Sequence, residues 1–355
     1  MIPSARLILI GAAVCWLGCV DSIDISLPDN VSGRLVIEGS VDRTETRYVF
    51  SVFVTRTSAI DESLERYVEP ATINMIYQGA EIFELNNGEA RTFSIGDFHD
   101  LFGGEPASAQ FGIEVEVDGE LYSSEPQHIL DSPPPGELST QMITREELNE
   151  REFILERSYV ELRITSDLRN STGQLVSLLW DVQSYYQFQE IVWDENDFFF
   201  NPKICYVFEL DKSNEINFIN ALGISSDRIT SFKINEKFAD YKFHSGHLYQ
   251  VIQRTLDANA AEYWDQVSQA IQREGTIFDD PPGRAISNIS STANLNTEVL
   301  GYFYASAVDT IYKLATPGET GNQRHLCAQI IQPSPCCACL DIAGSSLEQP
   351  KNWIQ

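Results

Sequence analysis

The only closely spaced histidines in the sequence, His244 and His247, could bind a metal ion. On a strand, a spacing of three points the two rings to opposite faces, so a shared metal would require a turn at Gly246. Asp240 could then complete a zinc-like site, which needs further protein ligands. The interpretation we favour is a turn with solvated histidines, so we predict no cofactor and keep these two residues as the metal candidates.

One loop carries four oxygen-bearing side chains, Asp194-Glu195-Asn196-Asp197, and three phenylalanines follow it directly. Calcium binds about six to eight oxygens, so this loop would supply only part of a shell, and a polar turn is favoured. A strand cannot point three consecutive rings into one core, so at least one ring should face outward. We therefore predict a partner-binding surface at Trp193, Phe198, Phe199 and Phe200. Burial of two of the phenylalanine rings is the alternative.

A second aromatic group could stack on sugar rings, and it consists of Trp180, Tyr185, Tyr186, Phe188 and Trp193. Aromatic side chains in strands more often fill a sandwich core, and we favour that interpretation. A small-molecule or glycan ligand is left open, because these residues do not identify one.

Five cysteines follow Cys19, and they are Cys205, Cys327, Cys336, Cys337 and Cys339. In an oxidising compartment they would form up to two disulfides and leave one thiol. We take Cys205, Cys327, Cys336 and Cys339 as the disulfide candidates, with their pairing open. The spacing of Cys336 and Cys339 also occurs in zinc sites, but zinc would need two further ligands, for which His325 and Cys327 are near.

The chain begins with the pattern of a secretory signal peptide. Arg6 precedes an apolar run over residues 7–17, and Gly18-Cys19 ends this run before a polar, acidic segment. The run is shorter than the roughly 20 residues that span a bilayer, so we predict a signal peptide over residues 1–18. A cysteine directly after a small residue predicts lipidation at Cys19, and an ordinary cut nearby is the alternative. Asp21 and Asp24 resemble the surface-export signal of Bacteroidota lipoproteins, which predicts an outer-membrane location facing the cell exterior.

The composition argues against several classes of function. A formal charge of −28 over 355 residues repels phosphate backbones and anionic membranes, so we predict no nucleic-acid partner. The sequence contains no nucleophile elbow, no HExxH pair and no phosphate-binding glycine loop. We therefore expect that the protein is not an enzyme.

The elements that must position these residues are mainly β-strands. After a tether over residues 19–33, short β-branched and aromatic runs follow one another through residues 34–130 without a helical period. We predict an immunoglobulin-like β-sandwich for residues 34–130, with one long loop over residues 98–106. Three consecutive prolines within residues 131–136 then predict a linker between two domains.

Residues 137–355 predict a second β-rich domain with a cysteine-rich C-terminal segment. Strands are expected over residues 159–165, 175–182, 185–193, 204–210 and 298–312. Apolar residues at helical spacing predict one amphipathic helix over residues 257–274, which Asp257 can cap and Gly275 can end. The predicted fold class is therefore mainly β throughout.

Several different short motifs follow one another in a characteristic order along nearly all of the mature chain. They are Leu35-Val36-Ile37-Glu38-Gly39, Val54-Thr55-Arg56-Thr57, Leu121-Tyr122-Ser123-Ser124-Glu125, Cys205-Tyr206, Tyr263-Trp264, Gly275-Thr276-Ile277-Phe278-Asp279, Val299-Leu300-Gly301-Tyr302-Phe303, and Cys336 with Cys339 before Pro350 and Trp353. In this order the chain resembles the Bacteroidota lipoprotein family catalogued as domain of unknown function 4249. It departs from that family at Ser287-Asn288-Ile289, where the family tends to have Gly-Asn-Ile, and in its Lys-Asn-Trp ending.

The resemblance implies a role, because members of this family often sit beside TonB-dependent outer-membrane receptors. We expect a non-enzymatic binding accessory of such a receptor barrel, acting in nutrient uptake and attached to the membrane by its lipid. An adhesin or structural surface protein is the alternative in the same compartment. A metal-dependent hydrolase that uses His244, His247 and nearby carboxylates is the enzymatic alternative.

Overall fold

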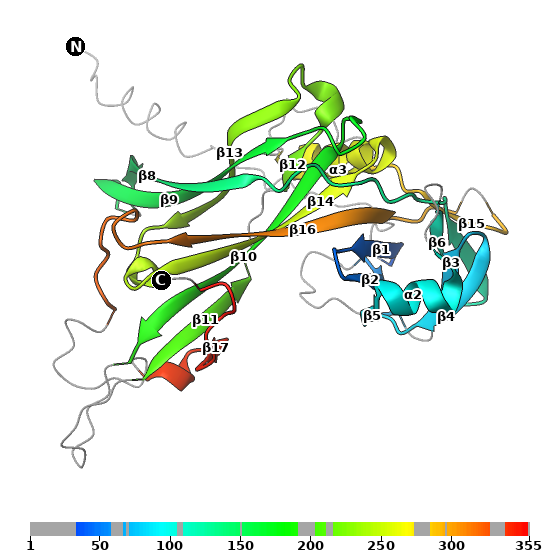
Figure 1. Ribbon diagram of the computed structural model, residues 1–355, viewed down its shortest axis with the longest axis horizontal. Coiled ribbons are helices and arrows are strands. Elements are labelled where there is room, and N and C mark those ends of the chain that lie inside the picture. Colours follow the sequence, from blue (N-terminus) through cyan, green and yellow to red (C-terminus); the bar gives the residue numbers. More distant parts are fainter. Residues whose placement is uncertain are drawn as a thin grey trace, which may run out of the picture.

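The computed structural model describes residues 33–57, 67–68, 71–104, 109–149, 151–190, 203–210, 216–272, 285–294, 297–326 and 338–353. Within these ranges the chain folds into three β-sheets and two α-helices (Figure 1). The mainly β fold class is therefore confirmed. The predicted signal peptide and Cys19 lie outside the described residues. No helix in the described part is long and apolar enough to cross a membrane.

The largest sheet has nine strands and runs through both predicted domains. Its order is β17 (Ser345–Ser346), β11 (Ile204–Leu210), β10 (Ser177–Gln189), β14 (His247–Leu256), β16 (Phe303–Ala315), β1 (Leu35–Arg43), β2 (Arg47–Arg56) and β5 (Arg91–Ser94), and β12 (Asn217–Ile219) pairs with β10. The two halves are joined by a parallel pair, in which Gly39 of β1 lies opposite Phe303 of β16. Parallel neighbours need a long crossover connection, and here most of the chain supplies it.

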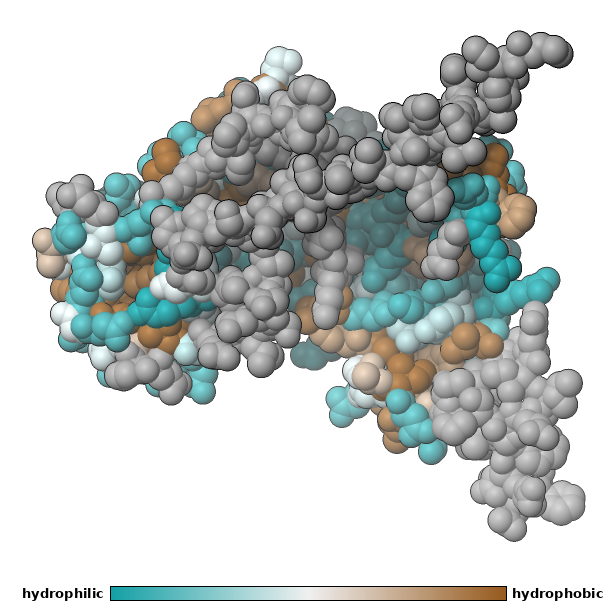
Figure 2. All heavy atoms as spheres, turned by 180° about the vertical axis from the view of Figure 1, so that it is seen from behind, coloured by the Kyte–Doolittle hydropathy of each residue, from teal (hydrophilic) through white to brown (hydrophobic). Residues whose placement is uncertain are grey.

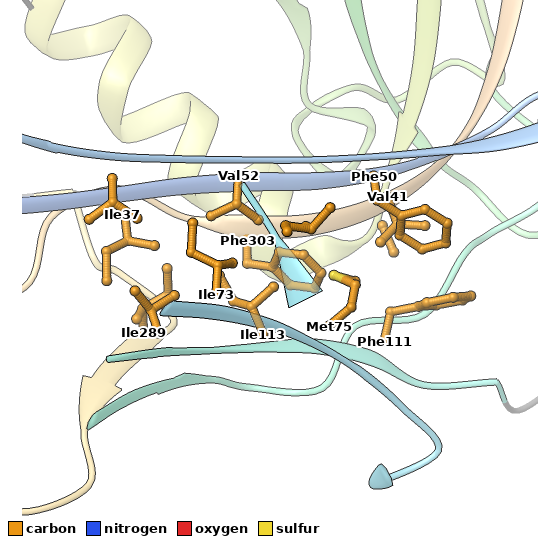
Figure 3. Close-up of a cluster of buried hydrophobic side chains, with 14 of the residues drawn as sticks. Ile37, Val41, Phe50, Val52, Ile73, Met75, Phe111, Ile113, Ile289 and Phe303 are labelled. Carbon is orange, nitrogen blue, oxygen red and sulfur yellow. The ribbon is translucent and has the colours of Figure 1, made fainter. Parts of the chain in front are cut away.

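A five-stranded sheet packs against one end of the large sheet. Its order is β15 (Ile289–Ser291), β7 (Glu120–Ser124), β6 (Phe111–Val117), β3 (Ala71–Tyr77) and β4 (Ala80–Leu85). Alternate residues of these strands are buried, as expected for strands with one face on a core. Figure 3 shows Phe303 in the middle of this core, between the strands of the two sheets. The two facing sheets form the sandwich-like arrangement that was predicted.

A three-stranded sheet packs over the other end, in the order β13 (Arg228–Phe238), β9 (Ile154–Asp167) and β8 (Glu137–Leu148). It encloses a second core around Trp180, Tyr249 and Leu162. Along β16, odd-numbered residues reach both cores, with Phe303 in the first and Ala315 in the second. Because side chains alternate along a strand, both small sheets cover the same face of the large sheet.

Helix α3 (Ala258–Gln272) covers part of the opposite face. Asp257 Oδ1 accepts a hydrogen bond from the backbone N–H of Ala260 at 2.8 Å, so this residue caps the helix as the sequence predicted. Tyr263 packs against Leu179 of β10 and Tyr302 beside β16. In Figure 2, which views the molecule from behind, hydrophilic and hydrophobic residues are interspersed over the visible surface.

Helix α2 (Ile95–Phe102) was not predicted, because residues 98–106 were interpreted as a loop. Ser94 begins the helix by accepting a hydrogen bond from the backbone N–H of Asp97 at 3.1 Å. Phe98 is fully buried in the first core, and Phe102 packs beside it at a ring distance of 5.1 Å. The helix is only eight residues long, so its apolar period was too short to recognise.

The predicted division at residues 131–136 also needs correction, because the chain returns to the first core after leaving it. Ile289, Val299 and Phe303 belong to that core although they lie in the predicted second domain. The return passes through Gly301, whose φ is +92° and where an added Cβ would lie 2.1 Å from the carbonyl oxygen of Ile37. Only glycine allows β1 and the entry to β16 to approach so closely.

Candidate functional site

The structure places His247 in the interior rather than in a solvated turn. The residue is fully buried at the start of β14, and its ring stacks on Phe243 at 4.4 Å and lies 4.7 Å from Tyr249. Burial lowers the pKa of His247 well below its usual value, because the charged ring would lose its hydration. His247 therefore packs as a neutral aromatic ring.

His244 and Asp240 have separate structural roles. Asp240 caps the short 3-10 helix Tyr241–Phe243 by accepting a hydrogen bond from Lys242 N at 2.9 Å. His244 follows that helix, and its Nδ1 lies 2.6 Å from the carbonyl oxygen of Gln323. Among the described residues, no group of three or more histidine, cysteine or acidic side chains is arranged to hold a metal ion.

Two of the four candidate cysteines form a disulfide. Cys205 of β11 is bonded to Cys339, the first residue of the 3-10 helix Cys339–Asp341, with their Cα atoms 5.8 Å apart. Both residues are fully buried beside Phe188. The bond ties the C-terminal segment to the edge of the large sheet, while Cys327 and Cys336 lie outside the described residues.

The aromatic group proposed from residues 180–193 is mainly a core feature. Trp180 and Phe188 are almost fully buried, and Trp180 Nε1 donates a hydrogen bond to Gln253 Oε1 at 2.9 Å. Tyr185 is half-buried and packs on Phe208 at a ring distance of 5.1 Å. The predicted partner surface at Trp193, Phe198, Phe199 and Phe200 lies outside the described residues.

A different aromatic cluster lines a cavity of about 160 Å³ between α3 and strands β1, β2 and β16. We call this cavity the aromatic pocket, and its lining residues are Glu38, Gly39, Ser40, Ser51, Phe53, Tyr263, Trp264, Tyr302 and Tyr304. It lies on the face of the large sheet opposite the two cores, where α3 packs. The alternation of strand residues puts Tyr302 and Tyr304 on this same face.

Four rings form the wall of the aromatic pocket. Tyr263 stacks on Tyr302 with ring centres 4.7 Å apart, and it meets Trp264 edge-on at 5.5 Å. Trp264 in turn meets the ring of Tyr304 edge-on at 6.3 Å. Phe53 is 38% exposed and stands where the pocket opens to solvent. The mixture of stacked and edge-on contacts holds the rings in fixed orientations.

Polar atoms of the aromatic pocket are incompletely satisfied. Trp264 Nε1 and Tyr302 Oη are buried and have no hydrogen-bond partner in the structure. Leaving such an atom without a partner costs roughly 1–3 kcal/mol, so its occurrence in a native fold calls for an explanation. By contrast, Ser40 Oγ and Ser51 Oγ hydrogen-bond each other at 3.1 Å on the sheet side of the pocket.

The phenols of the aromatic pocket stay protonated at neutral pH. Burial, aided by the charge of Glu38, raises the pKa of Tyr263 to about 12. Burial likewise raises the pKa of Tyr302 and of Tyr304 far above the usual value. Each hydroxyl therefore keeps its proton and remains able to donate a hydrogen bond.

A partly buried group of ion pairs adjoins the aromatic pocket on strands β1, β10 and β14. Arg254 Nε donates to Asp42 Oδ2 at 3.1 Å, and the same guanidinium pairs with Asp181. Ser306, which lies two residues after Tyr304 on β16, donates a hydrogen bond from its Oγ to Asp42 Oδ1 at 2.9 Å. The arginine charge is thus matched by carboxylates on the two other strands, and Tyr304 of the pocket lies within the electrostatic reach of all three charges.

The aromatic residues of this pocket were not predicted to form a common site. Tyr263 and Trp264 were interpreted as the apolar side of a helix, and Tyr302 and Tyr304 as part of a strand. A tyrosine at every second position of a strand was the available signal, because it places two phenols on one face. The pairing of β1 with β16 that completes the pocket has no such local signal.

A family model described as a domain of unknown function (DUF4249) matches residues 20–311. The matched region contains every residue that lines the aromatic pocket. No curated protein and no solved structure matches the chain. Because the matched region covers most of the sequence, the chain belongs to this family of proteins with a domain of unknown function.

Proposed function

We propose that this chain is a surface lipoprotein that binds a small ligand and serves as an accessory of a TonB-dependent receptor. In this proposal the lipid on Cys19 attaches the protein to the outer membrane, and residues 19–33 form the tether. The signal pattern at residues 1–18 and the resemblance to lipoproteins found beside such receptors support this role. The protein presents the ligand to the receptor barrel and does not convert it.

The aromatic pocket is the observation that carries the binding role. Ligand sites are typically concave and apolar, with a few polar groups that fix orientation. The pocket combines fixed aromatic faces with the unpartnered atoms Trp264 Nε1 and Tyr302 Oη. These groups suit stacking and hydrogen bonding to a ligand, which is the chemistry of a binding protein.

Affinity purification from the native membrane tests the receptor role. The tagged full-length protein is extracted with mild detergent, and the proteins that accompany it are identified. We expect a TonB-dependent barrel in near-stoichiometric amount. A Cys19→Ala variant is the matched control, and we expect it to leave the membrane fraction and lose the barrel.

Two results would contradict this proposal. An anchored protein that repeatedly purifies without a barrel would exclude the accessory role, and attachment to matrix or cells would then favour an adhesin. A Cys19→Ala variant that still incorporates labelled palmitate would exclude lipidation at that residue.

A further inference from the structure

We infer that the aromatic pocket binds one neutral sugar ring, such as the terminal residue of a glycan. The inference deepens the proposed binding function and rests on it. It follows from the volume of the pocket, the orientation of its rings and the hydrogen-bonding groups that lack partners.

The volume of the pocket limits the ligand to a single ring. At about 160 Å³ the cavity is well below the roughly 300–1,000 Å³ typical of sites for drug-sized molecules. Phe53 and Glu38 are exposed at its edge, so a longer chain could continue from the bound ring into solvent. The pocket therefore matches one end of a larger molecule better than a whole compact cofactor.

The rings offer faces and edges to the ligand. An aromatic face carries partial negative charge, and the C–H groups on one side of a pyranose carry partial positive charge. A sugar ring can therefore lie flat on one aromatic side chain while its hydroxyls point outward from its rim. Tyr263, Trp264 and Tyr304 provide surfaces in two nearly perpendicular orientations for this contact.

The unpartnered polar atoms select among ligand classes. The indole Nε1–H of Trp264 can only donate, so its partner must be an acceptor. A hydroxyl oxygen accepts hydrogen bonds, so two hydroxyls of one sugar ring can accept from Trp264 and from Tyr302. A saccharide carries several hydroxyls on one ring, so a single bound ring can satisfy both atoms.

Other ligand classes fit the pocket less completely. An ammonium ion would be attracted to the rings and to Glu38, but it offers no acceptor to the indole N–H. An apolar ring would leave both polar atoms without partners. An anion would meet Glu38 and the field of a chain with a formal charge of −28.

Saturation-transfer NMR on the full-length protein in detergent micelles tests the inference. The probes are the methyl glycosides of glucose, galactose, mannose and N-acetylglucosamine, together with choline as a cationic probe. We expect at least one glycoside to bind, with its C–H protons closest to the aromatic rings, and choline not to compete. Failure of all four glycosides to bind, or displacement by choline, would overturn the inference.

Three variants locate the binding site. Tyr302→Phe removes only the hydroxyl, and Trp264→Phe removes the indole N–H, so each should weaken glycoside binding about 3- to 10-fold, the equivalent of one hydrogen bond. Tyr312→Phe is the matched control, because Tyr312 lies on β16, is exposed and does not line the pocket. Equal affinity of the wild type and a Tyr302→Phe/Trp264→Phe double variant would place the sugar elsewhere and overturn the assignment.

Different results would contradict the sugar inference and the receptor-accessory role. The double variant should still purify with the receptor barrel, because the barrel is not expected to contact the interior of the pocket. Intact barrel association without glycoside binding overturns the sugar inference alone. Glycoside binding without a barrel overturns the accessory role alone.

Discussion

Removing the Cys205–Cys339 disulfide should lower the free energy of unfolding by about 3–5 kcal/mol. The bond joins residues that are 134 apart in sequence. For a loop of this length, the loss of chain entropy in the unfolded state corresponds to about 5 kcal/mol at room temperature. Measured losses commonly fall below this figure, because unfolded chains retain some compactness.

Urea unfolding followed by tryptophan fluorescence measures the effect in the Cys205→Ala/Cys339→Ala variant. The denaturant slope should also rise, because an unfolded chain without the cross-link exposes more surface. Val207→Ala is the matched control, since Val207 packs in the same small core and leaves the cross-link intact. That variant should lose stability without a change in slope. A loss below about 1 kcal/mol in the double variant, with an unchanged slope, would refute the reasoning.

Three further predictions concern stability. Gly301→Ala should lower the free energy of unfolding by more than about 2 kcal/mol, because the added methyl group would collide with the backbone of Ile37. Gly119 also has a positive φ but has open space around it, so Gly119→Ala should lower the free energy of unfolding by only about 1 kcal/mol. Equal losses of stability in thermal unfolding would contradict the steric argument. Gln253→Leu should cost about 1–3 kcal/mol in urea unfolding because Trp180 Nε1 loses its acceptor, and an unchanged stability would mean that this hydrogen bond is dispensable. Burial lowers the pKa of His247 in the folded state, so below about pH 6.5 unfolding takes up a proton and the free energy of unfolding decreases as the pH is lowered, by up to about 1.4 kcal/mol per pH unit. His247→Leu should reduce this pH dependence in urea unfolding measured between about pH 7 and pH 5, and an identical pH dependence in the variant would contradict the prediction.

Local patterns predicted single elements well. The strand expected over residues 204–210 has these bounds in the structure, and the helix expected from residue 257 begins at Ala258. Two strands were expected over residues 175–182 and 185–193, but residues 177–189 form one strand, β10. Gln183 and Ser184, which lie between the two expected ranges, continue the strand, and Ser184 is buried opposite Tyr249.

Features that depend on distant pairing could not be predicted. Neither Leu35–Arg43 nor Phe303–Ala315 carries a residue pattern that specifies the other as its parallel neighbour. A strand encodes which of its faces is buried, but it encodes its partner only through the packing of the whole sheet. The aromatic pocket is lined by residues of both strands, so the proximity of these residues could not be predicted from the sequence.

The late return of the chain to the first core has a consequence for biosynthesis. A nascent chain released after residue 130 would carry β1 and β7 with open edges, because their partners β16 and β15 had not yet been made. Open edges of apolar strands invite pairing with other chains. The strands that are synthesised first therefore cannot complete their sheets until β15 and β16 near the C-terminal end have been synthesised.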